Sequence, residues 1–168
     1  NATIDVTVTA NTLTYTGNAQ NLVTGESSVG TIQYSLDGSS WSSTVPTGTN
    51  AGTYTVYYKV ELANYDTVSS SVEVTIAKAE NSITLTPDTD ITVKYGETLT
   101  LPTATATFGT PECDHTLEQL VNAGTYTVTW TVEGTDNYAE ATETITVTIT
   151  NATIDVTVTA NTLTYTGN

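Results

Sequence analysis

The 168-residue chain is strongly acidic, with 18 Asp and Glu side chains against three Lys and no Arg, for a formal net charge of −15. Because phosphate contacts need clustered Lys and Arg, this balance argues against a nucleic-acid partner and against an anionic membrane surface. The chain has no apolar run near the ~20 residues that a membrane helix needs, so we expect no direct membrane insertion. Threonine contributes 42 residues, which predicts a polar surface made mostly of hydroxyl and amide groups.

The opening segment alternates apolar and polar residues, which predicts a strand over 1–9 with one buried face. The same eighteen residues, NATIDVTVTANTLTYTGN, stand at 1–18 and again at 151–168. This identity indicates a tandem array with a period of 150, whose next repeat begins at 151. An alternative is a strand that completes a sheet, either in the same molecule or in its neighbour.

The middle of the first period contains a hairpin signal, Asp37-Gly38, between the apolar runs 32–36 and 41–45. Strict alternation then predicts a strand over 53–61, and the segment SVEVTI predicts a closing strand over 71–76.

A weaker repeat lies inside the period. The heptapeptide NAGTYTV occupies 50–56 and returns at 122–128. Each copy is followed by Val-Glu, by Asn-Tyr and by a closing strand, which is TITVTI (144–149) in the second copy. We therefore expect two related domains, 1–78 and 79–150, with 151–168 starting a third; the best helical candidate is a single turn over 116–121.

Short alternating strands with turn signals between them are typical of sandwiches. The predicted fold class is all-β, with two tandem Ig-like antiparallel β-sandwich domains plus the opening strand of a third. In Ig-like sandwiches a tyrosine near the start of strand F bonds back to upstream backbone. The Asn-Ala-Gly-Thr-Tyr segments assign Tyr54 and Tyr126 to this tyrosine corner.

The order NAGTYTV, Asn-Tyr and closing strand, together with YTGNAQNL (15–22), IQYSLDGSSW (32–41) and YGETL (95–99), resembles the MBG-type and related bacterial Ig-like repeats. That resemblance implies an extracellular location on the bacterial cell surface, in a tandem stalk or adhesin. It implies no active site.

Polar clusters that could carry chemistry are sparse. Glu112, Cys113, Asp114 and His115 are consecutive, whereas a nucleophile and its base must oppose each other in space, so we expect neither a catalytic nor a metal site there. Cys113 could instead form an intermolecular disulfide, because an odd cysteine in a secreted protein favours pairing.

Two further candidate sites involve charged side chains. The close pair Asp88 and Asp90 is a weak candidate for calcium, which prefers 6–8 oxygen ligands; otherwise no cofactor is expected. A self-formed isopeptide bond would need one of the three lysines, and Lys94 is the least excluded.

Aromatic residues offer a second kind of site. Trp130 shares a face with the core residues of its strand, so we expect it to be buried. Trp41 follows the Asp-Gly turn and Tyr57 points away from its core set, so both could stack on sugar rings as a glycan platform. The alternative for both is ordinary sheet packing.

The expected function is structural and not enzymatic: a repeat unit of a long extracellular bacterial surface fibre or adhesin stalk, acting as a semi-rigid spacer with neighbouring repeats of the same chain as its partners. One period should extend roughly 70–80 Å from the rise of its strands. Two alternatives remain open. One is a filament subunit in which 1–18 or 151–168 completes a sheet in a like chain, and the other is a module that binds a glycan or a host protein.

Overall fold

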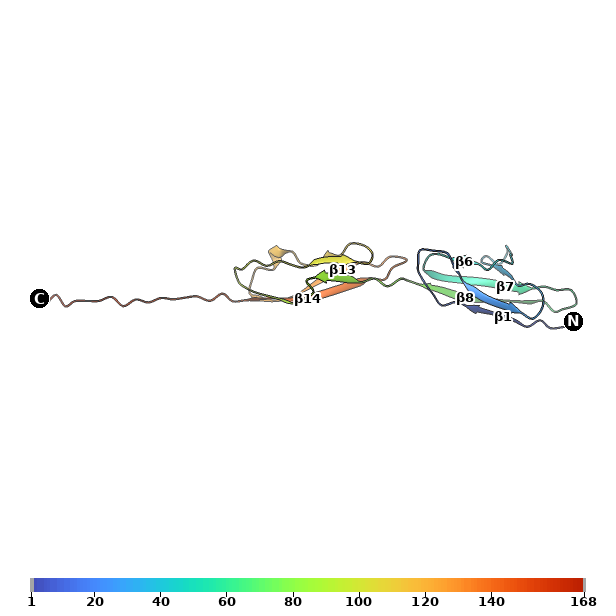
Figure 1. The fold of residues 1–168 in the computed structure, drawn as a ribbon, viewed down its shortest axis with the longest axis horizontal. Helices are drawn as coiled ribbons and strands as arrows, with labels where there is room; N and C mark the ends of the chain where they lie inside the picture. Colours follow the sequence, from blue (N-terminus) through green and yellow to red (C-terminus); the bar gives the residue numbers. More distant parts are fainter. Residues whose placement is uncertain (1, 168) are drawn as a thin grey trace.

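The structure is a computed structural model that describes residues 2–167; Asn1 and Asn168, which belong to the two identical segments, lie outside the described residues. Its regular elements are strands, apart from one turn of 3-10 helix, η1 (Leu117–Gln119). The predicted all-β class is therefore confirmed, and η1 falls inside the helical turn predicted over 116–121. The molecule is elongated, with an N-terminal half (2–77) and a C-terminal half (79–150) arranged end to end and a tail (151–167) leaving the far end (Figure 1).

The N-terminal half contains two layers of sheet. One layer has the strand order β2-β8-β7-β5, and the facing layer contains the pairs β1-β4 and β3-β6. The strands of this half are β1 (Val6–Ala10), β2 (Leu13–Thr14), β3 (Gln20–Asn21), β4 (Val23–Ser27), β5 (Gln33–Ser35), β6 (Thr47–Gly48), β7 (Gly52–Val60) and β8 (Val68–Ala77).

The core of the N-terminal half forms because alternate residues of each strand face inward. Val56 and Val60 of β7 are fully buried, and Val74 and Ile76 of β8 are almost so. From the facing layer, Val23 of β4 packs into the same cluster. The period-2 pattern of the sequence thus translates directly into one buried face per sheet.

The C-terminal half repeats this plan with fewer strands. One sheet has the order β10-β14-β13-β12, and β9 pairs with β11. Its core is a separate cluster that contains Trp130, 4% exposed, and Val128 and Val147, both fully buried; Trp130 is therefore a core residue, as predicted. The strands are β9 (Ile83–Thr86), β10 (Ile91–Lys94), β11 (Thr103–Ala106), β12 (Glu112–Cys113), β13 (Gly124–Val132) and β14 (Ala141–Thr150).

The expectation of wholly antiparallel sheets is wrong at one place in each half. Strand β2 runs parallel to β8, and β10 runs parallel to β14. In the N-terminal half the opening segment pairs antiparallel with β4 as far as Ala10 and then crosses to the other layer at Leu13. The crossing lets Leu13 pack against the same core from the opposite side, and the segment then runs in the same direction as the closing strand.

The tail has the sequence of the opening segment but none of its structure. Residues 151–167 form no strand and are exposed along their whole length, extending straight away from β14 (Figure 1). Ile4 is 6% exposed, whereas Ile154, the same residue of the repeat, is 86% exposed. Because the sequences are identical, the difference comes from the partner strands β4 and β8, which only the N-terminal copy has.

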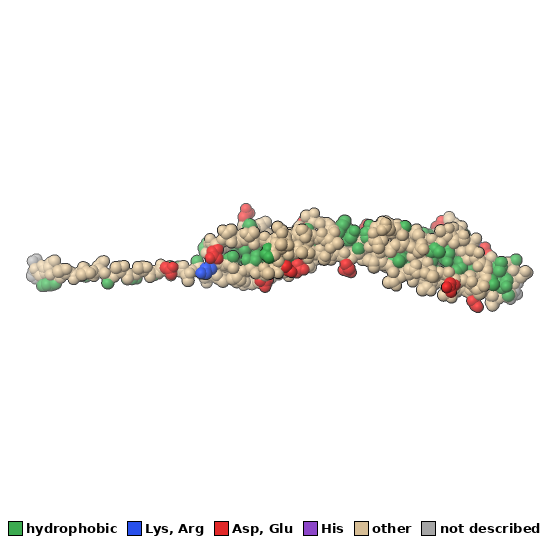
Figure 2. All heavy atoms as spheres, viewed as in Figure 1, with side chains coloured by type: hydrophobic (Ala, Val, Ile, Leu, Met, Phe, Trp, Pro, Cys, Tyr) green, Lys and Arg blue, Asp and Glu red, His purple; other side chains and the backbone are tan. Residues whose placement is uncertain are grey.

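The face drawn in Figure 2 consists mostly of backbone and uncharged polar side chains, with separated acidic side chains and few lysines. This distribution matches a composition in which Thr is abundant and only 12% of residues are charged. Within residues 2–167, no helix is long and apolar enough to cross a membrane.

Candidate functional site

The most elaborate set of contacts between distant parts of the chain lies at the junction, where the N-terminal half passes the chain to the C-terminal half. Strand β8 ends at Ala77, and Lys78 is the single residue before Ala79. The N–H of Ala79 donates to the carbonyl of Asn137 at 2.9 Å, and the carbonyl of Ala79 accepts from the N–H of Ala139 at 2.9 Å. The chain is therefore fixed to the C-terminal half one residue after it leaves the N-terminal sheet.

Asn137 links the two halves through its side chain. Its Oδ1 accepts a hydrogen bond from the backbone N–H of Ala51 at 2.8 Å, and its Nδ2 donates to Oδ1 of Asn50 at 3.3 Å. Asn137 is half-buried, as is Ala51. One carboxamide thus uses its acceptor and its donor on the same loop of the other half, which fixes its orientation.

The loop that receives Asn137 is itself fixed by a tyrosine. The hydroxyl of Tyr54 donates to the carbonyl of Asn50 at 2.8 Å, and the hydroxyl of Tyr126 donates to the carbonyl of Asn122 at 2.9 Å. Each bond reaches back four residues and closes the Asn-Ala-Gly loop. Tyr54 and Asn137 therefore both hydrogen-bond to the same loop of the N-terminal half.

An aromatic cluster covers another side of the junction. The ring of Tyr138 stacks on Phe108, with 4.0 Å between centroids and 5° between planes. Tyr15, from the N-terminal half, meets Tyr138 edge-on at 5.4 Å. Tyr15 is held in place by its N–H, which donates to the carbonyl of Ala77 at 2.8 Å. An edge-to-face pair at 5.4 Å is a favourable aromatic contact.

The linking residue makes a fourth contact. The ammonium of Lys78 donates to the carbonyl of Thr135 at 2.6 Å. The junction thus combines a backbone bridge, a carboxamide, an aromatic contact and an ammonium, spread around a one-residue link. The arrangement contains no nucleophile paired with a base; what it can do is hold two sheets in a fixed relative orientation.

The residues of the junction were not singled out by the sequence, although the signal was present. The recurring Asn-Ala-Gly and Asn-Tyr motifs predicted a tyrosine corner and a closing strand within each half. In the structure, Asn50 of one motif and Asn137 of the other contact each other across the junction. A repeated motif can therefore serve the contact between repeats as well as the fold of each one.

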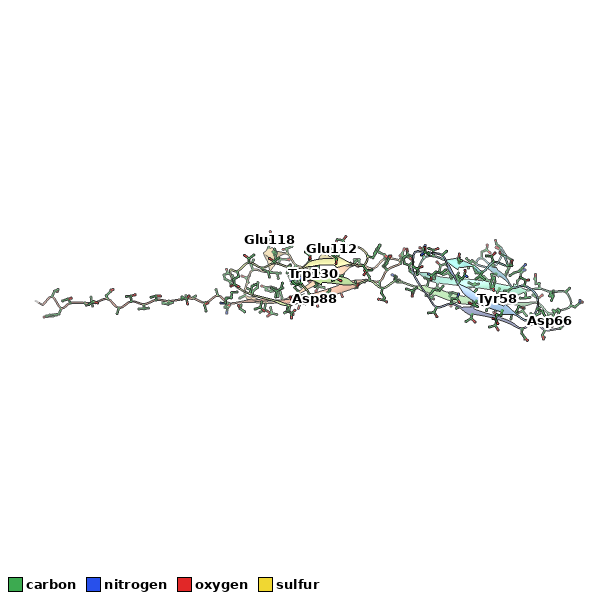
Figure 3. The ribbon with its side chains drawn as sticks, viewed as in Figure 1. Tyr58, Asp66, Asp88, Glu112, Glu118 and Trp130 are labelled. Carbon is green, nitrogen blue, oxygen red and sulfur yellow. The ribbon has the colours of Figure 1, made fainter. Side chains whose placement is uncertain are left out.

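The two residues of the predicted glycan platform lie together. Trp41 and Tyr57 line one shallow hollow with Tyr58 and the serines of β8, on the outer side of the N-terminal sheet; Tyr58 is labelled in Figure 3. The ammonium of Lys59 lies 4.7 Å from the centroid of the Trp41 ring and 3.1 Å from Glu61. One face of the indole is thus already covered by a cation, which leaves less of it free to stack on a sugar.

The loop beside this hollow is organised by Asp37. Its carboxylate accepts hydrogen bonds from the N–H groups of Ser40 and Ser39 and from the hydroxyls of Ser35 and Ser40, at 2.7–2.8 Å. These bonds hold the pKa of Asp37 far below its usual range, and the bond from the backbone N–H of Ser40 has the largest effect. Gly38 has a φ of 72°, which a residue with a side chain adopts only with strain.

Cys113 lies exposed on the two-residue strand β12 and is not in a disulfide. Its neighbours form a local hydrogen-bonded group in which Asp114 Oδ1 lies 2.7 Å from His115 Nδ1 and accepts from the N–H of Thr129 at 2.8 Å. Desolvation raises the pKa of Asp114, but the bonds from His115 and Thr129 outweigh it and lower that pKa overall. The group therefore ties β12 to β13, and its exposure leaves Cys113 accessible to a thiol on another molecule.

Asp88 and Asp90 stay exposed in the loop before β10, and Figure 3 labels Asp88 there. Oδ1 of Asp90 accepts from the N–H of Thr146 at 2.7 Å, so this carboxylate pins the loop to β14. Among residues 2–167, no group of three or more His, Cys, Asp or Glu side chains is placed to hold a metal ion.

Comparison with known proteins gives little. No protein-family model matches the chain, and no curated protein sequence matches it. A solved structure of Clostridium thermocellum CbhA fibronectin(III)-like modules aligns over 94% of this chain and 100% of that chain, at 14% identity and a TM-score of 0.34. A score of that size does not establish a common fold, so the description of the fold rests on the strands and cores of this chain alone.

Proposed function

We propose that the chain is a structural repeat unit of a long extracellular bacterial fibre or adhesin stalk. In this proposal the two halves are tandem Ig-like domains, and the unit acts as a semi-rigid spacer. The observation that carries the proposal is the junction: a one-residue link, with the carboxamide of Asn137 bonded to the Asn50–Ala51 loop of the other half. A flexible connection between independent modules would need none of these contacts.

The geometry explains why such a unit would resist bending. A link of one residue leaves almost no slack, and hinge motion that separates the two halves breaks the contacts across the junction. Bending away from Asn137 separates it from Ala51, and bending away from Tyr138 separates it from Tyr15. The two halves lie end to end, so a rigid junction converts chain length into reach (Figure 1).

Surface chemistry and sequence support the same reading. The surface is largely uncharged and the net charge is −15, which keeps like fibres apart and soluble. The resemblance to MBG-type repeats supports a place on the bacterial cell surface, where neighbouring repeats of the same chain are the partners. The identical segments 1–18 and 151–168 support repetition with a period of 150.

Particle length tests the proposal. The 168-residue chain and a chain of four periods would be imaged by negative-stain electron microscopy, with the mass of each sample measured by light scattering. We expect monomeric rods whose length grows in proportion to the number of periods. A four-period chain carrying Asn137→Ala in every period should give bent particles with shorter end-to-end distances. Compact or randomly coiled particles from the unmodified four-period chain would contradict the proposal.

One observation favours a second candidate, a filament subunit that assembles by strand complementation. The tail has the sequence that forms β1 and β2 in the N-terminal half, yet it is extended and exposed. A tail could in principle replace the opening strand of another molecule. The replaced strand is identical, however, so the exchange creates no new contacts and costs association entropy. Filaments forming from the 168-residue chain alone, seen in the light-scattering measurement above, would favour this candidate over a monomeric spacer.

A further inference from the structure

We infer that the far end of the C-terminal half is a docking face for the N-terminal half of a following repeat, and that the two join in the register of the observed junction. The face comprises the Asn122–Ala123 loop, Tyr95 and the hollow beside η1. The inference rests on the proposed function and specifies the contact that would make a longer array rigid. Three correspondences between the observed junction and this face carry it.

The first correspondence is the path of the chain. At the observed junction, the closing strand ends at Ala77, one residue follows, and Ala79 bridges to the Asn-Tyr loop. At the far end, β14 ends at Thr150 and one residue precedes Ala152, the copy of Ala2. Ala2 makes the same parallel bridge: its N–H donates to Asn64 at 3.1 Å and its carbonyl accepts from Asp66 at 2.9 Å. The first bridge of a following repeat would therefore form two residues after the closing strand ends, as it does at the observed junction.

The second correspondence is an aromatic side chain. The N–H of Tyr95 donates to the carbonyl of Thr150 at 2.8 Å, as the N–H of Tyr15 does to that of Ala77. Both tyrosines follow the strand that runs parallel to the closing strand. Tyr15 packs edge-on against Tyr138 of the next half, whereas Tyr95 is 55% exposed. The residue that would cover Tyr95 is Tyr65 of a following repeat, because Tyr65 occupies the place of Tyr138 in the bridge.

The third correspondence is the loop that receives the carboxamide. Asn122 and Ala123 repeat Asn50 and Ala51, and their loop is closed by Tyr126 in the same way. Both residues are exposed here, whereas Ala51 is half-buried against Asn137. The counterpart of Asn137 is Asn64, which is also exposed. It lies at the opposite end of the molecule beside Asp66, which is labelled there in Figure 3.

The docking face includes a hollow that is bordered by exposed aliphatic side chains. A hollow of about 340 Å³ lies beside η1 and the end of β14, and it is bordered by Leu117 and Val121, which are 50% and 53% exposed. At the opposite end of the molecule, Leu62 is 40% exposed on the loop that carries Asn64. The chain path would bring these two ends together at a second junction. Contact between them would then bury Leu62 of the following repeat against Leu117 and Val121.

The two junctions would differ in two respects. Asn151 stands in the place of Lys78, so the ammonium that donates to Thr135 has no counterpart. The Asn64 loop is one residue shorter than the Asn137 loop, and Asn64 has a φ of 71°. We therefore assign the second junction a larger apolar contribution, from Leu62 on one side and from Leu117 and Val121 on the other.

Amide hydrogen exchange tests the inference on a chain of two periods, made by repeating residues 19–168 after Asn168. The amide of Ala123 in the first period should exchange about tenfold more slowly than in the 168-residue chain, because it gains the hydrogen bond that Ala51 makes to Asn137. Asn64→Gly in the second period should abolish this protection, and glycine keeps the positive φ without strain. The matched control places the same substitution in the first period, where Ala123 should stay protected.

Two results would overturn the inference: unchanged exchange at Ala123 in the two-period chain, or protection that survives Asn64→Gly in the second period. Either can occur while rods still lengthen with period number, and the proposed function would then stand on the observed junction. Particles that fail to lengthen would count against the proposed function whatever Ala123 does.

Discussion

Oδ1 of Asn137 accepts a 2.8 Å hydrogen bond from the backbone N–H of Ala51, which lies 86 residues earlier in the chain. The bond joins two halves whose cores are separate clusters. Folding of either half alone does not require it, so its loss should show in how the halves are connected and hardly at all in how each one folds.

Asn137→Ala should make the junction more susceptible to trypsin. The chain has three lysines and no arginine, and Lys78 is the one at the link. Cleavage after Lys78 requires the link to leave its bridge to Asn137 and Ala139, which the junction contacts oppose. We expect cleavage after Lys78 to become roughly three- to tenfold faster. This factor corresponds to losing the net free energy of one hydrogen bond or slightly more. Mass spectrometry of the fragments over time measures it.

Asn64→Ala is the matched control for this experiment, because Asn64 belongs to the same motif but lies exposed at the other end of the molecule. It should leave the cleavage rate after Lys78 unchanged. Equal rates for Asn137→Ala and the unmodified chain would show that the carboxamide does not hold the junction.

Tyr54→Phe should lower the free energy of unfolding of the N-terminal half by about 0.5–1.5 kcal/mol. The substitution keeps the ring and removes only the hydroxyl that donates to the carbonyl of Asn50. Tyr126→Phe should act similarly on the C-terminal half, through Asn122. Urea denaturation followed by tyrosine and tryptophan fluorescence measures both. Tyr57→Phe, on an exposed ring, is the control and should change stability by less than about 0.5 kcal/mol.

Gly48→Ala should destabilise the N-terminal half by about 1–3 kcal/mol through overpacking. A methyl group there would meet Tyr54 Cζ at 2.9 Å and Ile76 Cδ1 and Leu22 Cδ2 at 3.0 Å, and Leu22 and Ile76 are almost fully buried. Gly124→Ala is the control, since its nearest atoms lie at 3.7 Å. Thermal melts of both variants test the difference, and similar melting temperatures would contradict it.

The Asp37 loop should keep its order well into acid. The hydrogen bonds from Ser40, Ser39 and Ser35 lower the pKa of Asp37 in the folded state. Its contribution to stability is therefore fully present above the unfolded value of about 3.9 and is lost as the pH falls through the lower folded value. A carboxyl carbon NMR titration should give a midpoint below 3.9. Asp37→Asn keeps one acceptor oxygen and removes the titration, so loop signals that still change with pH in that variant would count against this account.

Removing residues 1–18 should turn the chain into a self-complementing subunit. The deletion opens the places of β1 and β2 beside β4 and β8, and the tail of another molecule carries the identical sequence. The tail leaves the opposite end of the molecule, so it cannot return to its own N-terminal half (Figure 1). We expect head-to-tail oligomers by light scattering, and monomers when a synthetic 1–18 peptide is added in excess.

A chain of residues 19–150, which lacks both copies, is the control and should not form these oligomers. Oligomers from that chain would show that association comes from exposed core residues and not from strand complementation.

Sequence periodicity was sufficient for the long strands. The expected strand over 53–61 corresponds to β7, and the closing strands correspond to β8 and β14, because each carries an apolar residue at every second position. The run 41–45 fails as a strand: only Ser42 bridges, to Tyr34. Within this run the N–H of Thr44 donates to Oγ of Ser42 at 3.1 Å, and such bonds between side chain and backbone compete with the sheet.

The junction could not be predicted in the same way. Alternation reports which face of a strand is buried, but it carries no information about which loop meets which loop when two halves are placed end to end. Asn50 and Asn137 are ordinary loop residues in their own halves, and only their relative position makes them partners. The crossing at Leu13 was missed for a related reason, since an apolar residue can face the core from either layer.

The two parallel strand pairs determine how the molecule would carry tension. When the chain is pulled from its two ends, β10 is drawn one way and β14 the other, so the hydrogen bonds between them are loaded in shear and must break together. The same holds for β2 and β8. The C-terminal half shares this load over four residue pairs, from Ile91 to Lys94, whereas the N-terminal half shares it over two. The N-terminal half should therefore yield first, and an array of such units would lengthen in two groups of steps, first at a lower force as the N-terminal halves open and then at a higher force as the C-terminal halves open.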